Sequence, residues 1–110
     1  LLSVWRPLVR PLEDYPLAYC DWQTVDVARD YKPADLIFPH YIGEQYLVTH
    51  HPDHRWHFLS RQLSDEFTLL KCWDNRQDGA AHTSFVNPNS PKDAKLRESV
   101  EFRCMVSDGG

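Results

Sequence analysis

Ala81-His82-Thr83-Ser84-Phe85, followed by Arg97-Glu98-Ser99-Val100-Glu101-Phe102-Arg103, is the stretch that decides the fold. A histidine opens a short run, a loop containing two prolines follows, and an arginine precedes a segment in which apolar and polar residues alternate. Alternation with a period of two is typical of a β-strand with two different faces. The stretch therefore predicts two neighbouring antiparallel strands, over 82–86 and 100–106.

The rest of the chain indicates further short strands separated by turns. Alternating or apolar runs predict strands over 44–50, 56–59 and 67–73, and the last is apolar enough on both faces to be a central strand. A helix is predicted over 21–31, begun by Asp21 or Thr24 and closed by Pro33. The sequence thus predicts a mainly β fold with at most one or two short helices.

Composition limits the classes of protein to which the chain can belong. With 110 residues, 42% of them hydrophobic, it is long enough for one small domain. A net charge of −4 argues against a nucleic-acid partner, and no apolar run reaches the roughly 20 residues of a membrane span. Cys20, Cys72 and Cys104 form no C-x-x-C pattern, which indicates free thiols, buried at Cys72 and Cys104, and a reducing, cytoplasmic location.

Four histidines crowd one short segment and suggest a small metal-binding module. They are His50, His51, His54 and His57. His51-Pro52-Asp53 also has the H-x-D spacing of two ligands of an iron facial triad. A three-residue pattern of common types arises often by chance, however, and a proline turn separates these two. A solvated turn is the favoured interpretation.

His82 and Arg97 form the stronger candidate site. Neighbouring strands joined by a loop of this length would bring both side chains into one cavity, with Ser99 beside the arginine. The arginine fork matches a carboxylate, and the serine hydroxyl adds a donor. A metal-binding histidine beside a carboxylate-binding arginine would suit a 2-oxo acid. The alternatives are a hydrogen-bonded histidine at a strand edge and a surface arginine near Glu98 or Glu101.

Six sequence blocks in order cover nearly the whole chain and carry a resemblance to a known family. They are Ser-Val-Trp-Arg-Pro-Leu (3–8), Pro-Leu-Ala-Tyr-Cys-Asp (16–21), His-Arg-Trp (54–56), Asp-Glu-Phe-Thr-Leu-Leu-Lys-Cys-Trp-Asp (65–74), Ala-His-Thr-Ser-Phe (81–85) and Arg-Glu-Ser-Val-Glu-Phe-Arg (97–103). Together they resemble the C-terminal half of the fungal hydroxylase/desaturase family, which includes proteins labelled GA4 desaturase-like or related to the cephamycin methoxylation protein.

The resemblance implies a fold, a pair of cofactors and a set of site residues. The fold would be a partial, distorted double-stranded β-helix, jelly-roll-like, with residues 1–110 as a single domain forming the C-terminal part of a larger oxygenase-like domain. The activity would be that of an Fe(II)/2-oxoglutarate hydroxylase or desaturase of secondary metabolism, acting on a small organic substrate. In that frame His82 resembles the distal iron ligand, and Arg97 with Ser99 resembles the 2-oxoglutarate clamp.

The same resemblance implies that the iron site is incomplete on this chain. In the family, the first histidine and the aspartate of the triad lie upstream of the Trp-Arg-Pro-Leu block, so 51–53 is not that pair. One ligand out of three binds metal poorly. We therefore expect an inactive or weak fragment that needs a second chain or a missing N-terminal part. The alternative is a non-catalytic partner, stabilising protein or relic that keeps the fold without a complete metal site.

Overall fold

The structure is a computed structural model that describes residues 1–76 and 79–107, and most of its regular elements are strands. The strands are β1 (Leu2–Pro7), β2 (Leu17–Cys20), β3 (Tyr31–Phe38), β4 (Tyr41–Val48), β5 (Trp56–Phe58), β6 (Thr68–Lys71), β7 (His82–Ser84) and β8 (Ser99–Cys104). The helical elements are a 3-10 turn, η1 (Trp22–Thr24), and a single-turn helix, α1 (Val27–Asp30). The predicted mainly β fold is confirmed.

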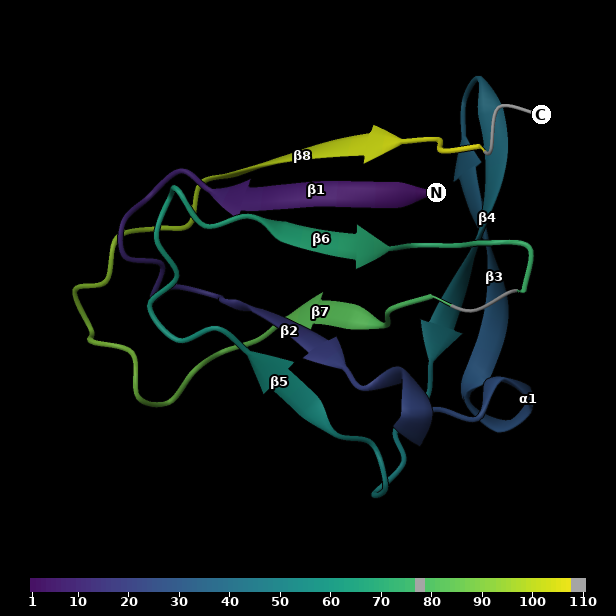
Figure 1. The fold of residues 1–110 in the computed structure, drawn as a ribbon, viewed down its shortest axis with the longest axis horizontal. Helices are drawn as coiled ribbons and strands as arrows, with labels where there is room; N and C mark the ends of the chain where they lie inside the picture. Colours follow the sequence, from purple (N-terminus) through teal and green to yellow (C-terminus); the bar gives the residue numbers. More distant parts are fainter. Residues whose placement is uncertain (77–78, 108–110) are drawn as a thin grey trace.

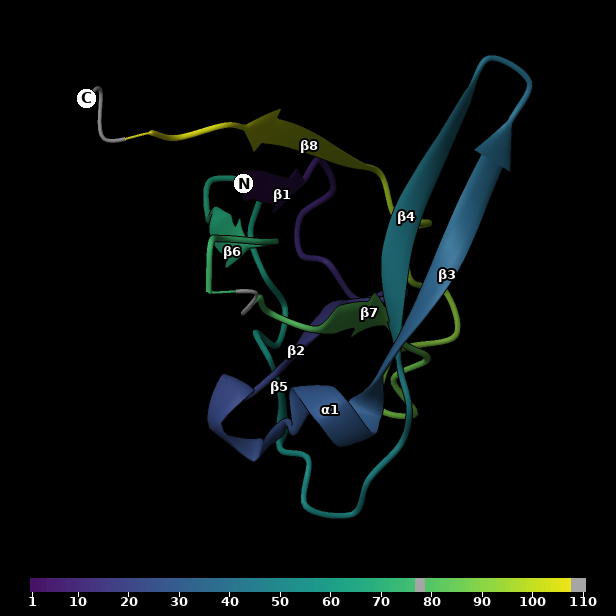
Figure 2. The same cartoon turned by 90° about the vertical axis from the view of Figure 1, so that its right-hand side faces the viewer.

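Two three-stranded antiparallel sheets form the body of the molecule (Figure 1). One has the order β6-β1-β8 and the other the order β5-β2-β7, so β1 and β2 are the central strands. Among the described residues, β3 and β4 pair only with each other, as a ribbon that stands beside the two sheets (Figure 2). The arrangement agrees with the predicted jelly-roll-like fold, in which two sheets face each other.

The buried core lies between the two sheets. Trp5 and Leu70 come from one sheet, Leu17 from the other, and Leu12 from the connection between β1 and β2. The two sheets are also joined by a hydrogen bond of 2.8 Å between the hydroxyl oxygens of Tyr19 and Thr68. Burial of apolar surface on the facing sides is what holds the sheets in this orientation.

The strand predicted over 44–50 corresponds to β4, which begins earlier, at Tyr41. Its partner β3 was not predicted, because its sequence shows no alternation of apolar and polar residues. Proline is expected to interrupt a strand, yet Pro33 lies inside β3 opposite Tyr46. The Thr49 backbone N–H donates to the Asp30 carbonyl at 2.8 Å, which fixes the alternation so that position 33 turns its backbone nitrogen away from β4. No ladder hydrogen bond is therefore lost at the proline.

Three predictions of local structure are wrong. The helix over 21–31 is replaced by two short pieces, because Asp21 caps η1 and Asp26 begins α1 separately. The strand predicted over 67–73 is not central: β6 is an edge strand, and Leu69 is 66% exposed. The thiol of Cys104, predicted to be buried, is exposed because it sits on the edge strand β8.

In the described part of the chain, the helices are far too short and polar to cross a membrane.

Replacing Tyr19 by Phe tests the bond between the sheets. Thr68 keeps its contact with the Gln62 amide, at 3.3 Å, so the variant loses one hydrogen bond. We expect the free energy of unfolding to fall by about 1 kcal/mol. Urea denaturation followed by tryptophan fluorescence measures the change. Tyr46→Phe, on a half-exposed ring of the ribbon, is the control; equal stability of both variants would contradict the assigned role.

Candidate functional site

A row of three side chains crosses the inner face of the second sheet. Tyr19 on β2 lies directly opposite His57 on β5 and His82 on β7. Residues opposite one another in antiparallel strands project to the same face. Because the Tyr19 hydroxyl reaches Thr68 in the other sheet, this shared face is the inner one. His57 and His82 therefore face the space between the sheets.

The inner face of the first sheet carries the facing residues. Trp5 on β1 lies opposite Thr68 on β6 and Glu101 on β8. Since side chains alternate along a strand, Ser99 and Arg103 share the inward side with Glu101. The predicted alternation of β8 is thus present, and Arg103 Nε donates to Glu101 Oε1 at 2.6 Å along the same strand. Ser99, Glu101 and Arg103 of β8 therefore lie on the side of the first sheet that faces His57 and His82.

The imidazole of His82 has a defined tautomer. Its Nδ1 lies 2.8 Å from the Ala80 carbonyl oxygen, which can only accept a hydrogen bond, so Nδ1 carries the proton in the neutral ring. The lone pair is then on Nε2. A histidine whose second nitrogen donates to a backbone carbonyl is the usual form of a metal-ligating imidazole. His82 therefore fits the role of a metal ligand chemically.

Arg97 is held at the entrance to β8 by the segment that precedes β2. Its backbone N–H donates to Asp14 Oδ2 at 2.9 Å, and its Nη1 donates to the Tyr15 carbonyl at 3.0 Å. Tyr15 has a φ of 45°, in the left-handed region that bulky residues rarely adopt. One edge of the guanidinium thus has a backbone partner, and its planar fork has further N–H groups for an anion.

The sequence predicted that the strands of His82 and Ser99 are neighbours, and that prediction is wrong. β7 and β8 are not neighbouring strands, because β7 belongs to the sheet of β2 and β8 to the sheet of β1. His82 and Ser99 instead lie on the facing sides of two different sheets, and both residues are exposed. Among the described residues, no hydrogen bond or ion pair links His82 with Arg97 or Ser99. Their assignment as a common site remains a prediction.

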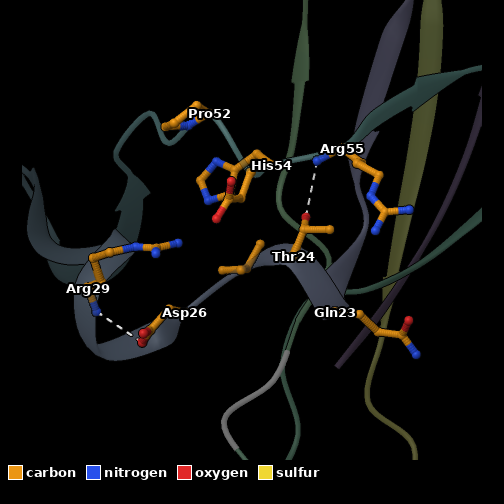
Figure 3. Close-up of a pocket in the computed structure, with 9 residues that line it drawn as sticks. Gln23, Thr24, Asp26, Arg29, Pro52, His54 and Arg55 are labelled. Atoms are coloured by element: carbon orange, nitrogen blue, oxygen red, sulfur yellow. Dashed lines mark hydrogen bonds between the residues drawn. The ribbon is translucent and has the colours of Figure 1, made fainter.

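A different pocket, of about 630 Å³, lies between the η1–α1 segment and the turn after β4 (Figure 3). It is lined by Gln23, Thr24, Val25, Asp26, Arg29, Pro52, Asp53, His54 and Arg55. Figure 3 shows the Arg29 backbone bonded to Asp26 and the Arg55 backbone bonded to Thr24 across this region. The pocket contains none of the three predicted site residues.

Asp30 beneath this pocket is a buried junction. Arg29 donates through Nε and Nη2 to its two carboxylate oxygens at 2.7 and 3.0 Å, and His54 Nε2 lies 2.8 Å from Oδ2. The Asp26 backbone N–H adds a bond of 2.9 Å. The hydrogen bond from Arg29, with those from His54 and Asp26, keeps the pKa of Asp30 well below its ordinary range, against the opposing effect of burial. These contacts anchor the base of the ribbon.

The four crowded histidines do not converge on a metal site. His54 is 2% exposed and bonded to Asp30, whereas His57 belongs to the row on the inner face. His51 Nδ1 accepts the Asp53 backbone N–H at 3.1 Å, so the H-x-D pattern closes a local turn. Within residues 1–76 and 79–107, no three His, Cys, Asp or Glu side chains lie close enough together to hold a metal ion.

Comparison with known proteins agrees with this architecture. The chain is 41% identical over 112 residues to aspirochlorine biosynthesis protein N of Aspergillus oryzae, covering 96% of this chain and 47% of that protein. It is 38% identical over 117 residues to the Fe(II)/2-oxoglutarate-dependent dioxygenase nvfI of Aspergillus novofumigatus, covering 97% and 40%. Further relatives are named hydroxylase/desaturase and gibberellin cluster GA4 desaturase.

The solved structure of the iron and alpha-ketoglutarate-dependent endoperoxidase NvfI superposes with a TM-score of 0.82 at 35% sequence identity. The match covers 91% of this chain and 38% of that one. The predicted partial double-stranded β-helix is thereby confirmed. The chain spans about half, or less, of the length of the relatives it matches.

The two facing antiparallel sheets and the superposition on NvfI identify the class of the fold, a jelly roll. A family model described as "Oxidoreductase/YMDC permease-like domain" matches residues 1–107, and the chain belongs to this family. The predicted kinship with fungal hydroxylases and desaturases is confirmed by the relatives.

Two contacts that shape the site have no simple signal in the sequence. The oxygen that fixes the tautomer of His82 belongs to the Ala80 backbone, and any residue type supplies such a carbonyl. Tyr19 meets Thr68 across 49 residues of chain, so no local pattern pairs them. The alternation of Leu17 and Tyr19 is the signal that could have placed Tyr19 on the inner face.

Acid titration tests the junction at Asp30. A carboxyl whose pKa is lower in the folded than in the unfolded state stabilises the fold above its unfolded value, ordinarily 3.8, and this contribution is lost as pH falls through the folded value. We expect stability to fall below about pH 4 in the natural protein. Asp30→Asn should be less stable at neutral pH and should lack this part of the acid dependence.

Asp35→Asn, on the exposed part of the ribbon, is the matched control and should keep the acid dependence of the natural protein. Thermal unfolding followed by circular dichroism at several pH values measures both. An Asp30→Asn variant with an unchanged pH profile would contradict the assignment.

Proposed function

We propose that the chain is part of an Fe(II)/2-oxoglutarate-type oxidoreductase of secondary metabolism, a hydroxylase or desaturase acting on a small organic substrate. The observation that carries the proposal is the state of His82. Its imidazole faces the space between the sheets and donates through Nδ1 to Ala80, which leaves Nε2 for a metal. The names of the relatives support iron and 2-oxoglutarate as the cofactors.

Arg97 and Ser99 are proposed to hold the carboxylate of 2-oxoglutarate. Arg97 is held at two points: its backbone N–H donates to Asp14, and its guanidinium donates to the Tyr15 carbonyl. Such anchoring lowers the entropy that the side chain would lose on binding an anion. Ser99 begins β8 on the inward side and adds a hydroxyl donor two residues away.

The remaining iron ligands are proposed to come from outside this chain's described residues. A facial site needs three protein ligands, and His82 supplies one. Residues 1–110 would then act as a single unit, the C-terminal part of a larger oxygenase-like domain completed by an N-terminal part or a second chain. Iron with 2-oxoglutarate and O₂ would supply the oxidising chemistry. The residues described here would bind and orient.

A cytoplasmic location is proposed as well. Cys20, Cys72 and Cys104 are all free thiols, and Cys104 is exposed. Free exposed thiols persist in a reducing compartment.

Metal titration by NMR tests the role of His82. Mn(II), added with 2-oxoglutarate, should selectively broaden the backbone amide resonances of Ala81 and Thr83 beside His82, and paramagnetic broadening detects binding that is too weak for calorimetry. His82→Ala should abolish the site-specific broadening, whereas His51→Ala should leave it unchanged. If His51→Ala removed the effect and His82→Ala did not, the metal ligand would be misassigned.

Binding of 2-oxoglutarate tests Arg97. Arg97→Lys keeps the charge but loses the planar fork, so we expect affinity in the presence of Mn(II) to fall by about tenfold, with a larger loss for Arg97→Ala. Ligand-observed NMR measures both. Arg61→Lys, which alters an exposed pair with Glu13, is the control. Absence of any 2-oxoglutarate binding to the natural chain would favour a non-catalytic partner or stabilising protein that keeps the fold.

A further inference from the structure

The segment before β2 holds Arg97 through two acceptors of different kinds. The carboxylate of Asp14 accepts the backbone N–H of Arg97 at 2.9 Å, and the carbonyl of Tyr15 accepts a guanidinium N–H at 3.0 Å. These contacts join positions that are 83 and 82 residues apart in the sequence. The negative charge of Asp14 thus lies at the backbone of Arg97, and a neutral oxygen lies at its guanidinium.

This arrangement keeps the positive charge of Arg97 available for a ligand. A carboxylate bonded directly to the guanidinium would occupy its planar fork and compete with an anion. In the described part of the chain, Arg97 forms no ion pair, and its Nε and Nη2 groups have no hydrogen-bond partner. The guanidinium is therefore held in place without being neutralised, and the edge formed by Nε and Nη2 is left for a bidentate contact.

Tyr15 has a strained backbone at this point. Its φ of 45° lies in the left-handed region, where the Cβ of a bulky residue crowds the backbone. The side chain is half-exposed and is not one of the residues of the buried core. Strained backbone of this kind clusters at ligand clamps, where it belongs to the function. Here the conformation directs the Tyr15 carbonyl at the guanidinium of Arg97.

Contacts on both sides of Tyr15 maintain this conformation. On one side, Leu12 is buried in the core, and its backbone N–H donates to the Gln62 carbonyl at 2.8 Å. On the other side, the carbonyl of Pro16 accepts the Phe85 N–H at 3.2 Å. A strained residue persists where the surrounding structure fixes its neighbours in this way. All these partners are described residues of this chain, so the position of the Tyr15 carbonyl is set by this chain itself.

We propose that Asp14 is a positioning residue for Arg97 and that Asp14 and the Tyr15 carbonyl together order the guanidinium before a carboxylate binds. The inference rests on the proposed function, because the carboxylate is that of 2-oxoglutarate. An arginine side chain loses rotamer freedom when it binds a ligand, and one that is ordered beforehand loses less. Asp14 therefore increases the affinity for 2-oxoglutarate without touching it.

Substitutions of Asp14 and Tyr15 in the full chain test this role through 2-oxoglutarate binding in the presence of Mn(II), followed by ligand-observed NMR. Asp14→Ala removes the acceptor of the Arg97 N–H, and we expect the dissociation constant to rise by about fivefold. Asp14→Asn keeps an oxygen that accepts the same N–H and should retain the natural affinity. Tyr15→Asn should also retain it, because asparagine tolerates the left-handed conformation and the acceptor is a backbone carbonyl.

Asp21→Ala is the matched control. The Asp21 carboxylate also accepts a backbone N–H, from Gln23 at 3.0 Å, but it does so at the start of η1. This variant should lose comparable stability and keep the natural affinity for 2-oxoglutarate. In an Arg97→Ala background, Asp14→Ala should lower stability without reducing affinity further, because the side chain that Asp14 positions is absent.

A measurement without ligand separates this inference from the proposed function. The NMR order parameter of the Arg97 Nε–Hε bond should be high in the natural chain and in Asp14→Asn, and should fall below about 0.6 in Asp14→Ala. If the natural chain binds no 2-oxoglutarate, the proposed function fails, and the order parameter alone decides the role of Asp14. An Asp14→Ala variant with the natural order parameter, or with the natural affinity where the natural chain binds, would overturn the inference. Equal losses of affinity in Asp14→Ala and Asp21→Ala would overturn it too.

Discussion

Burial of Trp5, Leu17 and Leu70 between two three-stranded sheets is the interaction on which the rest of the structure depends. It fixes which face of β1 and β2 is internal, and strand alternation then transmits that choice to every paired strand. The Tyr19–Thr68 hydrogen bond adds a polar link across the same interface. Once these inner faces are set, the strand pairing fixes the face on which His82 lies and the face on which each side chain of β8 lies.

The candidate site and the core therefore share the strand β2. Tyr19 packs against the core and pairs with His82 in register, so the imidazole is positioned by the same strand that buries Leu17. Asp30 has a separate task. Its bonds to Arg29, His54 and Thr49 hold the base of the ribbon and explain why the histidine-rich turn is structural.

The strands near the two quoted blocks were predictable because their apolar and polar residues alternate. β3 and the first residues of β4 were not, because Pro33 is atypical of a strand and the exposed Ile37 and Ile42 interrupt the alternation of apolar and polar residues. The predicted helix failed because Asp21 and Asp26 each cap a separate short turn. Local sequence preference predicted correctly that Asp21 caps a helical turn. The length of each element was decided by its pairing with distant segments.

The amino-acid sequence by itself determined the family, the mainly β class and the three residues proposed for the site, because ordered blocks of side-chain types carry that information. Tertiary structure alone decided that His82 and Ser99 belong to facing sheets, since strand order depends on contacts between distant segments. It also decided that β1 and β2 are the central strands of the two described sheets. Pairing between remote strands is a property of the folded chain, and no local pattern encodes it.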